Sequence, residues 1–368
     1  RSARKPLWTI RHGSISINCS TSDSMVDMSQ QPRTLEERCE WTATDLDDES
    51  AYTEVFADDE LRQLDAALRH ALSVSDDVLD LGIDDFPLGS LADRLAHVER
   101  ELIDGRGVVR LRGIERERYS QREMEILYWG IGLHLGTPWA QNAKGHVLGD
   151  VTDQGKAPDD PTSRGNELGG IALPFHCDGA DLVGLMCLEN GLSGGRSLVA
   201  NAVRIHNELV REDPEAVAAL YEPQPFDYRG EQRDGARPWY EIPVFTEWDD
   251  RLFVRYIPPY IHASQRHPEA PRLTDAARRG LDRIVELADD PDHHVAMDLL
   301  PGDIQFIDNF HVMHGREAYH DDRTAGRVRH LKRLWLATTA LASRPPHFAA
   351  NVSEHWTERR SASHLTTS

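Results

Sequence analysis

The fold of this chain is constrained most by a succession of short apolar runs in its second half. The runs occupy residues 182–188, 197–201, 252–257, 295–300, 304–307 and 330–338. Turn sequences such as Pro301-Gly302-Asp303 separate them, and helical patterns intervene at 202–211 and 275–287. Many short strands divided by turns favour a sheet structure closed on itself, either a sandwich or a jelly roll. We therefore predict a mainly β fold with flanking helices.

A helical layer with one strand is expected to precede these runs. Residues 59–72 and 90–103 carry apolar side chains at helical spacing, and 107–113 alternates as a strand between glycines. Ser120 and Glu123 have the spacing of a capping box, which predicts the start of a further helix.

The ends of the chain differ from this pattern. Residues 1–50 are poor in periodic apolar positions, which predicts a disordered N-terminal tail. We expect a single domain over residues 51–345 and a C-terminal tail over 346–368.

The composition is that of an acidic globular protein. The 368 residues include 41 Lys and Arg against 62 Asp and Glu, which gives a formal net charge of −21. This charge repels phosphate backbones and anionic membrane surfaces, so neither nucleic acid nor a membrane is an expected partner. The four cysteines show no CxxC spacing, and no apolar run reaches the roughly 18 residues of a membrane-spanning helix. A cytoplasmic location is therefore predicted.

His176 and Asp178 form a candidate metal-binding pair. Side chains two residues apart in extended backbone project from the same face of a strand, whereas Cys177 between them points the other way, as a buried packing cysteine would. A second histidine from a distant strand would complete a 2-His-1-carboxylate facial triad, which leaves open coordination positions on a non-haem Fe(II). An isolated His-x-Asp pair is a weak signal, so the metal-site interpretation depends on further motifs elsewhere in the sequence.

Two histidines compete for the third position. His311 and His314 both follow the strand predicted at 304–307, far downstream of His176. Either could reach the metal pair from a separate strand, and either could instead be a hydrogen-bonded histidine at a strand end.

Two arginines and a serine could bind an organic acid. Arg329 and Arg333 lie at the last predicted strand, where a guanidinium could hold a carboxylate through two hydrogen bonds. Ser197 presents a small hydroxyl after the turn at Gly194-Gly195. Taken singly, such arginines are more often surface ion-pair formers and such a serine a turn residue. Together they are the parts of a site for 2-oxoglutarate.

The chain resembles the taurine dioxygenase-like (TauD/TfdA) family of Fe(II)/2-oxoglutarate-dependent oxygenases over roughly residues 105–340. The resemblance rests on four motifs in the family's order: His176-x-Asp178, Gly194-Gly195-x-Ser197, His314-Gly315-Arg316 and Arg329-x-x-x-Arg333. It implies a double-stranded β-helix (jelly-roll) core. It also implies Fe(II) as a cofactor, with His176, Asp178 and His314 as its ligands, His314 being preferred to His311 because Gly-Arg follows it.

The resemblance also implies 2-oxoglutarate as a cofactor. Arg329 matches the arginine that pairs with its distal carboxylate, and Arg333 matches the one nearer the substrate, although the two roles could be exchanged. Ser197 stands where relatives often carry Thr, which keeps the hydroxyl.

The implied reaction is the oxidation of an unactivated C–H bond by O2, with succinate and CO2 as coproducts. Halogenating relatives replace the carboxylate ligand with a small residue, so Asp178 favours hydroxylation or desaturation. The expected substrate is a small polar molecule, such as an amino acid or a natural-product intermediate, held by the loops 142–170 and 228–240. Two alternatives remain: a jelly-roll binding protein without turnover, and a cupin-like metalloenzyme that does not use 2-oxoglutarate. Homo-oligomerisation is left open.

Overall fold

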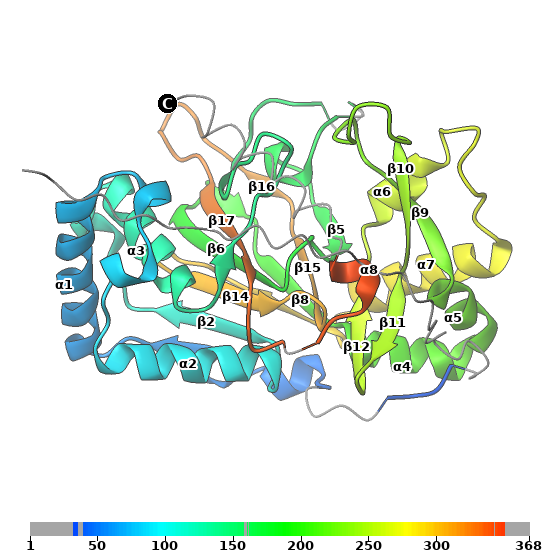
Figure 1. Ribbon diagram of the computed structural model, residues 1–368, viewed down its shortest axis with the longest axis horizontal. Helices are drawn as coiled ribbons and strands as arrows, with labels where there is room; N and C mark the ends of the chain where they lie inside the picture. Colours follow the sequence, from blue (N-terminus) through cyan, green and yellow to red (C-terminus); the bar gives the residue numbers. More distant parts are fainter. Residues whose placement is uncertain (1–31, 36–39, 158–159, 161, 342, 350–368) are drawn as a thin grey trace, which may run out of the picture. The chain divides into compact units, whose positions relative to one another are not determined.

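Two facing β-sheets form the centre of the protein (Figure 1). The computed structural model describes residues 32–35, 40–157, 160, 162–341 and 343–349. Within these residues, the larger sheet has seven strands in the order β1-β2-β14-β6-β17-β3, with β4 also paired to β17. The strands are β1 (Thr53–Val55), β2 (Val108–Arg112), β3 (Thr137–Pro138), β4 (Leu148–Val151), β6 (Leu182–Glu189), β14 (Ile304–Asp308) and β17 (His330–Ala337). The pairing is antiparallel except between β1 and β2.

The smaller sheet has the order β13-β8-β15-β5 in the described part of the chain. Its strands are β5 (Leu173–His176), β8 (Ser197–Asn201), β13 (His294–Met297) and β15 (Val312–Arg316), all antiparallel. A cavity between the sheets is lined by Leu185 and Leu331 of the larger sheet and by Ser197 and His314 of the smaller one. Two antiparallel-rich sheets that enclose a site confirm the predicted jelly-roll core with flanking helices.

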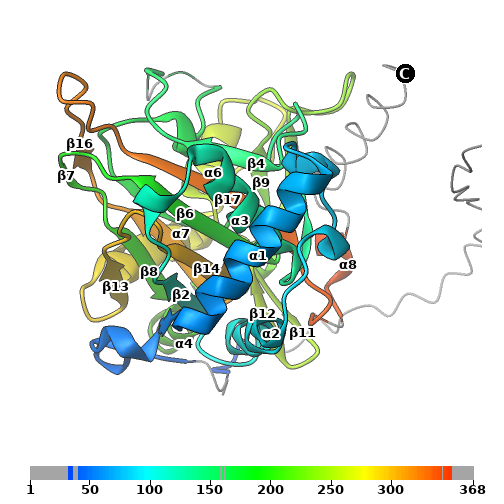
Figure 2. The ribbon, with the colours of Figure 1, turned by 90° about the vertical axis from the view of Figure 1, so that its left-hand side faces the viewer.

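Helices cover both sides of this core. The helices α2 (Ser90–Ile103) and α3 (Gln121–Leu133) lie against the larger sheet. Helix α1 (Asp58–Val74) packs on these two helices, and Figure 2 shows it crossing in front of the sheet. The helices α4 (Ala202–Glu212), α5 (Pro214–Tyr221) and α7 (Asp275–Asp289) pack together at the opposite end. The predicted capping box of α3 is confirmed, because Ser120 Oγ accepts from Glu123 N and Glu123 Oε2 accepts from Ser120 N.

An insertion of hairpins lies beside α6 (Pro258–Ser264), and the apolar periodicity did not reveal most of it. It comprises β9 (Pro223–Asp227) paired with β10 (Trp239–Pro243) and β11 (Phe245–Trp248) paired with β12 (Arg251–Val254). The strand predicted at 252–257 therefore ends three residues early, because the Pro258 turn starts a helix there. The loop between β9 and β10 brings further side chains to the cavity.

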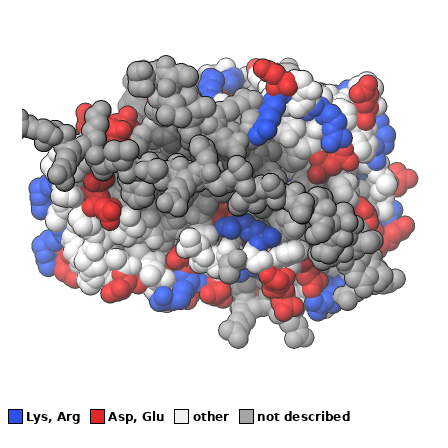
Figure 3. Space-filling view, in the orientation of Figure 1, with Lys and Arg blue, Asp and Glu red and all other residues white. Residues whose placement is uncertain are grey.

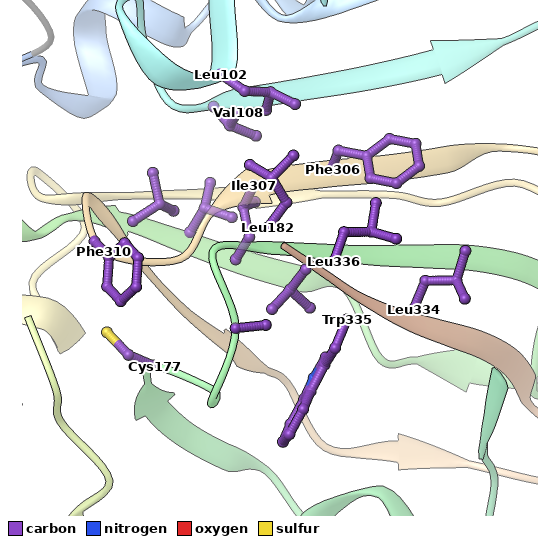
Figure 4. Packing of buried hydrophobic residues seen from close by; sticks show 14 of the residues in the cluster. Leu102, Val108, Cys177, Leu182, Phe306, Ile307, Phe310, Leu334, Trp335 and Leu336 are labelled. Atoms are coloured by element: carbon purple, nitrogen blue, oxygen red, sulfur yellow. The ribbon is translucent and has the colours of Figure 1, made fainter. Parts of the chain in front are cut away.

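The main core lies between α2 and the larger sheet and continues on the opposite face of that sheet. Figure 4 shows Leu102 of α2 over Val108 and Ile307, with Leu182 and Leu336 on the next strands. Each of these side chains is at most 2% exposed, and burying one such side chain contributes about 1.5–3 kcal/mol. This packing fixes the strands that carry the site. Cys177 is also fully buried, which confirms its predicted packing role.

The N-terminal boundary differs from the sequence prediction. Residues 40–50 were expected in a disordered tail, but Trp41 and Leu46 are buried in the core and Trp41 Nε1 donates to the carbonyl of Arg106 at 2.7 Å. Scattered anchoring side chains without helical or strand period explain why the sequence pattern missed this segment. Of the rest of the predicted tail, residues 1–31 and 36–39 lie outside the described residues.

At the other end, the expected C-terminal tail begins with a short helix. Helix α8 (Pro346–Ala349) places Phe348 against Phe253 and Phe310. Residues 350–368 lie outside the described part, and the single domain over 51–345 stays a prediction. Among the helices described, none is both long and apolar enough to cross a membrane.

Candidate active site

The structure brings His176, Asp178 and His314 together at one end of the cavity. Strands β5 and β15 pair with His314 opposite His176, and the two imidazole rings lie 4.2 Å apart. The Nε2 atoms of His176 and His314 are 3.9 and 3.7 Å from the carboxylate oxygens of Asp178. The three potential ligand atoms all lie within 4.8 Å of one another, so one metal ion could contact all of them.

The other candidate histidine has a different environment. His311 is 1% exposed and accepts a hydrogen bond at Nδ1 from Arg251, 2.9 Å away, beside the buried Asp308. These contacts anchor the turn between β14 and β15. The pairing register therefore supports the choice of His314 over His311.

The protonation states suit a metal. The Nδ1 of His176 donates to the carbonyl of Pro174 at 2.9 Å, because a carbonyl can only accept, and this leaves the Nε2 lone pair free for a cation. Burial lowers the pKa of His176, and burial together with the neighbouring His176 lowers the pKa of His314 to about 3. Although burial opposes ionisation of Asp178, Arg333 and the two histidines hold the pKa of that carboxyl well below its usual range. At neutral pH the site thus offers two neutral imidazoles and one carboxylate, which is the donor set that Fe(II) prefers.

Several partners hold Asp178 in place. Its Oδ2 accepts from Arg333 Nη1 at 3.1 Å and from Trp335 Nε1 at 2.9 Å. Asn309 accepts from the Asp178 amide and donates to the carbonyls of Asp178 and Ala180. The sequence analysis assigned no role to Asn309 or Trp335, because neither belongs to a motif that names its partner.

The cavity that these residues border has a volume of ≈ 310 Å³. Both loops that were expected to line it do so. They contribute Ser163, Arg164, Gly165, Asn166 and Leu168 from the first loop and Tyr228, Arg229, Glu231 and Tyr240 from the second.

Two buried arginines, Arg316 and Arg329, mark the other end of the cavity. They are 5% and 4% exposed, and their guanidinium carbons lie 4.7 and 5.3 Å from the ring centroid of Tyr319. Within the described residues, Arg316 Nε, Arg329 Nη1 and Tyr319 Oη are buried without a hydrogen-bond partner. Burial, and next the charge of Arg329, lower the pKa of Arg316 to about 10. Buried cations and donors without partners are costly unless an anion joins them, so this end of the cavity suits an anion.

The two remaining predicted residues also line the cavity. Ser197 is 4% exposed, and its Oγ donates to Gln305 Oε1 at 2.8 Å. Arg333 lies at the metal end, where its Nε donates to Gln141 Oε1 at 2.8 Å and its Nη1 contacts Asp178. Sequence reasoning missed Gln305 and Gln141. The sequence analysis used Arg316 only to choose His314 over His311. Arg316 lies two residues after a candidate ligand on the same strand, and this spacing could have indicated that Arg316 shares the cavity.

A family model and a curated relative match most of the chain. The model described as "Taurine catabolism dioxygenase TauD, TfdA family" matches residues 70–335. "FR-33289 synthase" of Streptomyces rubellomurinus is 32% identical over 315 residues, which cover 85% of this chain and 92% of the relative. "Enduracididine beta-hydroxylase" of Streptomyces hygroscopicus is 28% identical over 262 residues, which cover 62% of this chain and 71% of the relative.

Solved structures share the fold. A crystal structure of asparagine oxygenase in complex with Fe(II), 3-hydroxyasparagine and succinate superposes with a TM-score of 0.61 at 20% identity, covering 80% of this chain and 97% of the other. This likeness confirms the double-stranded β-helix architecture. The family match over most of the chain confirms the expected reaction class. The chain therefore belongs to the TauD/TfdA family of Fe(II)- and 2-oxoglutarate-dependent oxygenases.

Proposed function

We propose that the cavity between the sheets is the active site in which this oxygenase oxidises an unactivated C–H bond of a small molecule. The observation that carries the proposal is the presence of two features in one cavity. The cluster of His176, Asp178 and His314 lies at one end, and the buried pair Arg316 and Arg329 lies at the other. A metal centre and an anion site in this arrangement fit Fe(II) and 2-oxoglutarate.

Fe(II) would be held by His176, Asp178 and His314. When bound, Fe(II) together with 2-oxoglutarate and O2 supplies the oxidising chemistry, with succinate and CO2 as coproducts. The protein's part is to orient the ligands: Pro174 fixes the tautomer of His176, and Trp335 holds Oδ2 of Asp178.

The distal carboxylate of 2-oxoglutarate would lie between Arg329 and Arg316, with Tyr319 Oη as a further donor. This assignment gives the buried donors at that end an acceptor. Ser197 borders the same space. Val151, Leu185 and Leu331 form an apolar part of the cavity lining that suits the methylene carbons of the cosubstrate. Arg333 would face the substrate at the metal end, as the resemblance first suggested.

Hydroxylation is the outcome that the site favours. Asp178 occupies the position that a halide would need, and two relatives carry names of oxygen-inserting enzymes, enduracididine beta-hydroxylase and asparagine oxygenase. The substrate class that we propose is a small polar molecule. The cytoplasmic location and a homo-oligomeric state stay predictions.

The proposal is tested by adding Fe(II) and 2-oxoglutarate to the protein without oxygen. Chelation of the iron by the oxo acid should produce a weak visible charge-transfer band, and admission of O2 should release succinate. The variant Asp178→Ala should lose native turnover, and full activity in that variant would contradict the ligand assignment. Iron binding without the band would favour a cupin-like metalloenzyme, and absence of iron binding would favour a binding protein.

A further inference from the structure

We infer that the substrate is a small organic oxyanion without a free ammonium group. The inference rests on the proposed function, because it concerns the part of the cavity left over once Fe(II) and 2-oxoglutarate are placed. It comes from the partners of each charged side chain that lines that part.

Two arginines in this part of the cavity, Arg229 and Arg255, have no carboxylate partner within the described residues. Nη2 of Arg229 donates to the carbonyls of Asp160 and Ser163 at 3.2 and 2.7 Å, and its buried Nε has no hydrogen-bond partner. Arg255 is 8% exposed and donates to the carbonyl of Asp178 and, at 3.2 Å, to the hydroxyl of Tyr240. Neither guanidinium group therefore forms a salt bridge with a carboxylate in the described part of the chain.

The carboxylates that line the cavity are already engaged. Besides the metal-site residue Asp178, these are Asp227 and Glu231 among the described residues. Asp227 is fully buried and pairs with Arg266 at 2.8 Å and His267 at 2.9 Å. Glu231 pairs with Arg164 at 2.5 Å. An ammonium group entering the cavity would thus compete with an arginine or a histidine for each of these carboxylates.

The aromatic side chains offer no easier place for a cation. The guanidinium of Arg229 already lies over the ring of Tyr260, 5.4 Å from its centroid. The ring of Tyr240 packs against Phe226 and Tyr228, with centroids 5.3 and 4.8 Å away. Cation–π binding of an ammonium group needs an open ring face, and Arg229 and Phe226 each cover one face of these two rings.

The surplus of arginines over free carboxylates is confined to the cavity and does not reflect the charge of the whole chain. The whole chain has a net charge of −21, and acidic and basic side chains lie interspersed among the described residues on the face in Figure 3. Guanidinium groups fit carboxylate, phosphonate, phosphate and sulfonate oxygens through paired hydrogen bonds, and burial strengthens such contacts. A substrate oxyanion would supply the missing counter-charge for Arg229 and Arg255, and Nη2 of Arg333, which has no protein partner in the described structure, provides a further donor.

The test uses the anaerobic complex of the protein with Fe(II) and 2-oxoglutarate, whose visible band shifts when a substrate binds beside the metal. Matched pairs are added: taurine and N-acetyltaurine, 2-aminoethylphosphonate and its N-acetyl form, β-alanine and N-acetyl-β-alanine, with uncharged N-acetylethanolamine as the neutral member. We expect at least one N-acetyl anion to shift the band and to bind at least tenfold more tightly than its free amine, and the neutral compound to bind no better than the amines. The three head groups then distinguish sulfonate, phosphonate and carboxylate.

Two variants locate the anion site. Arg229→Gln and Arg255→Gln should each raise the dissociation constant of the best anion roughly 10- to 100-fold. Arg229→Gln should leave the affinity for 2-oxoglutarate unchanged, and Arg229→Lys should recover part of the loss. Arg237→Gln is the matched control, because Arg237 lies in the same loop region with its side chain 62% exposed.

The inference is overturned if the free amines or the neutral compound bind as tightly as the acylated anions, or if no anion shifts an intact band. It is also overturned if neither arginine variant weakens anion binding more than the control does. Loss of the band itself in the unaltered protein would refute the proposed function instead, so the two failures are distinguishable.

Discussion

Replacement of Arg329 by Leu should remove most of the affinity for 2-oxoglutarate. Arg329 is 4% exposed; its Nη2 donates to the carbonyl of Gly195 at 3.2 Å, and its Nη1 is buried without a partner in the described structure. A bidentate contact with a carboxylate would involve two charge-assisted hydrogen bonds of roughly 1.5–3 kcal/mol each. Because Arg316 would still face the carboxylate, we expect the lower end of the combined range, about 3 kcal/mol, or roughly a 100-fold rise in the dissociation constant.

The same substitution should leave the free protein as stable as before, or more stable. Arg316 and Arg329 are buried on either side of Tyr319, and the charge of Arg329 contributes to the lowered pKa of Arg316. Removing one of two buried like charges relieves their repulsion, and leucine suits the neighbouring apolar part of the cavity lining. An arginine with a purely structural role would instead lower the melting temperature when replaced.

The assay is an anaerobic titration of 2-oxoglutarate at fixed Fe(II), followed by the charge-transfer band, together with thermal unfolding without ligands. Arg327→Leu is the control, because Arg327 is exposed two residues upstream on the same segment. The reasoning is refuted if Arg329→Leu binds 2-oxoglutarate with unchanged affinity, or if the control loses as much.

Three further substitutions test the metal site, the helix packing and the acid stability. Trp335→Phe removes the hydrogen bond to Asp178 and should lower iron affinity by roughly tenfold or more in an Fe(II) titration; equal affinity would contradict the orienting role. Gly130→Ala would place a methyl group 2.2 Å from the Phe86 ring, so urea unfolding should show a loss of about 1–3 kcal/mol, and an unchanged midpoint would speak against close packing there. Hydrogen bonds from His330 and, with a smaller effect, from Lys332 of β17 lower the pKa of the Asp150 carboxyl to about 2. A depressed acid pKa stabilises the fold above the unfolded value near 3.8, and this contribution is lost as the pH falls towards 2. The Asp150 side chain is 45% exposed, so solvent screening limits the contribution to about 1 kcal/mol or less. The difference in free energy of unfolding between wild type and Asp150→Asn should shrink from pH 7 to pH 3, and a growing difference would contradict this assignment.

Local sequence patterns predicted much of the fold. The strand at 197–201 and the helix at 90–103 have the predicted bounds, because each follows from side-chain periodicity within one segment. The hairpins between residues 223 and 254 were largely missed, since their prolines and mixed polarity leave no clean alternation. Residues 40–50 were missed for a related reason: single anchors such as Trp41 fit pockets that other segments form.

The sequence by itself indicated a candidate metal-binding pair, since His176-x-Asp178 is local in extended backbone, and the order of the four motifs indicated the family. Tertiary structure decided which residues share the cavity. The pairing of β5 with β15 puts His314, rather than His311, opposite His176, and a shift of one residue would have turned that side chain to the other face. The unpaired charges of Arg229 and Arg255 likewise emerge only after folding, because whether a guanidinium has a counter-ion depends on segments far apart in the chain, and local periodicity carries no record of those contacts.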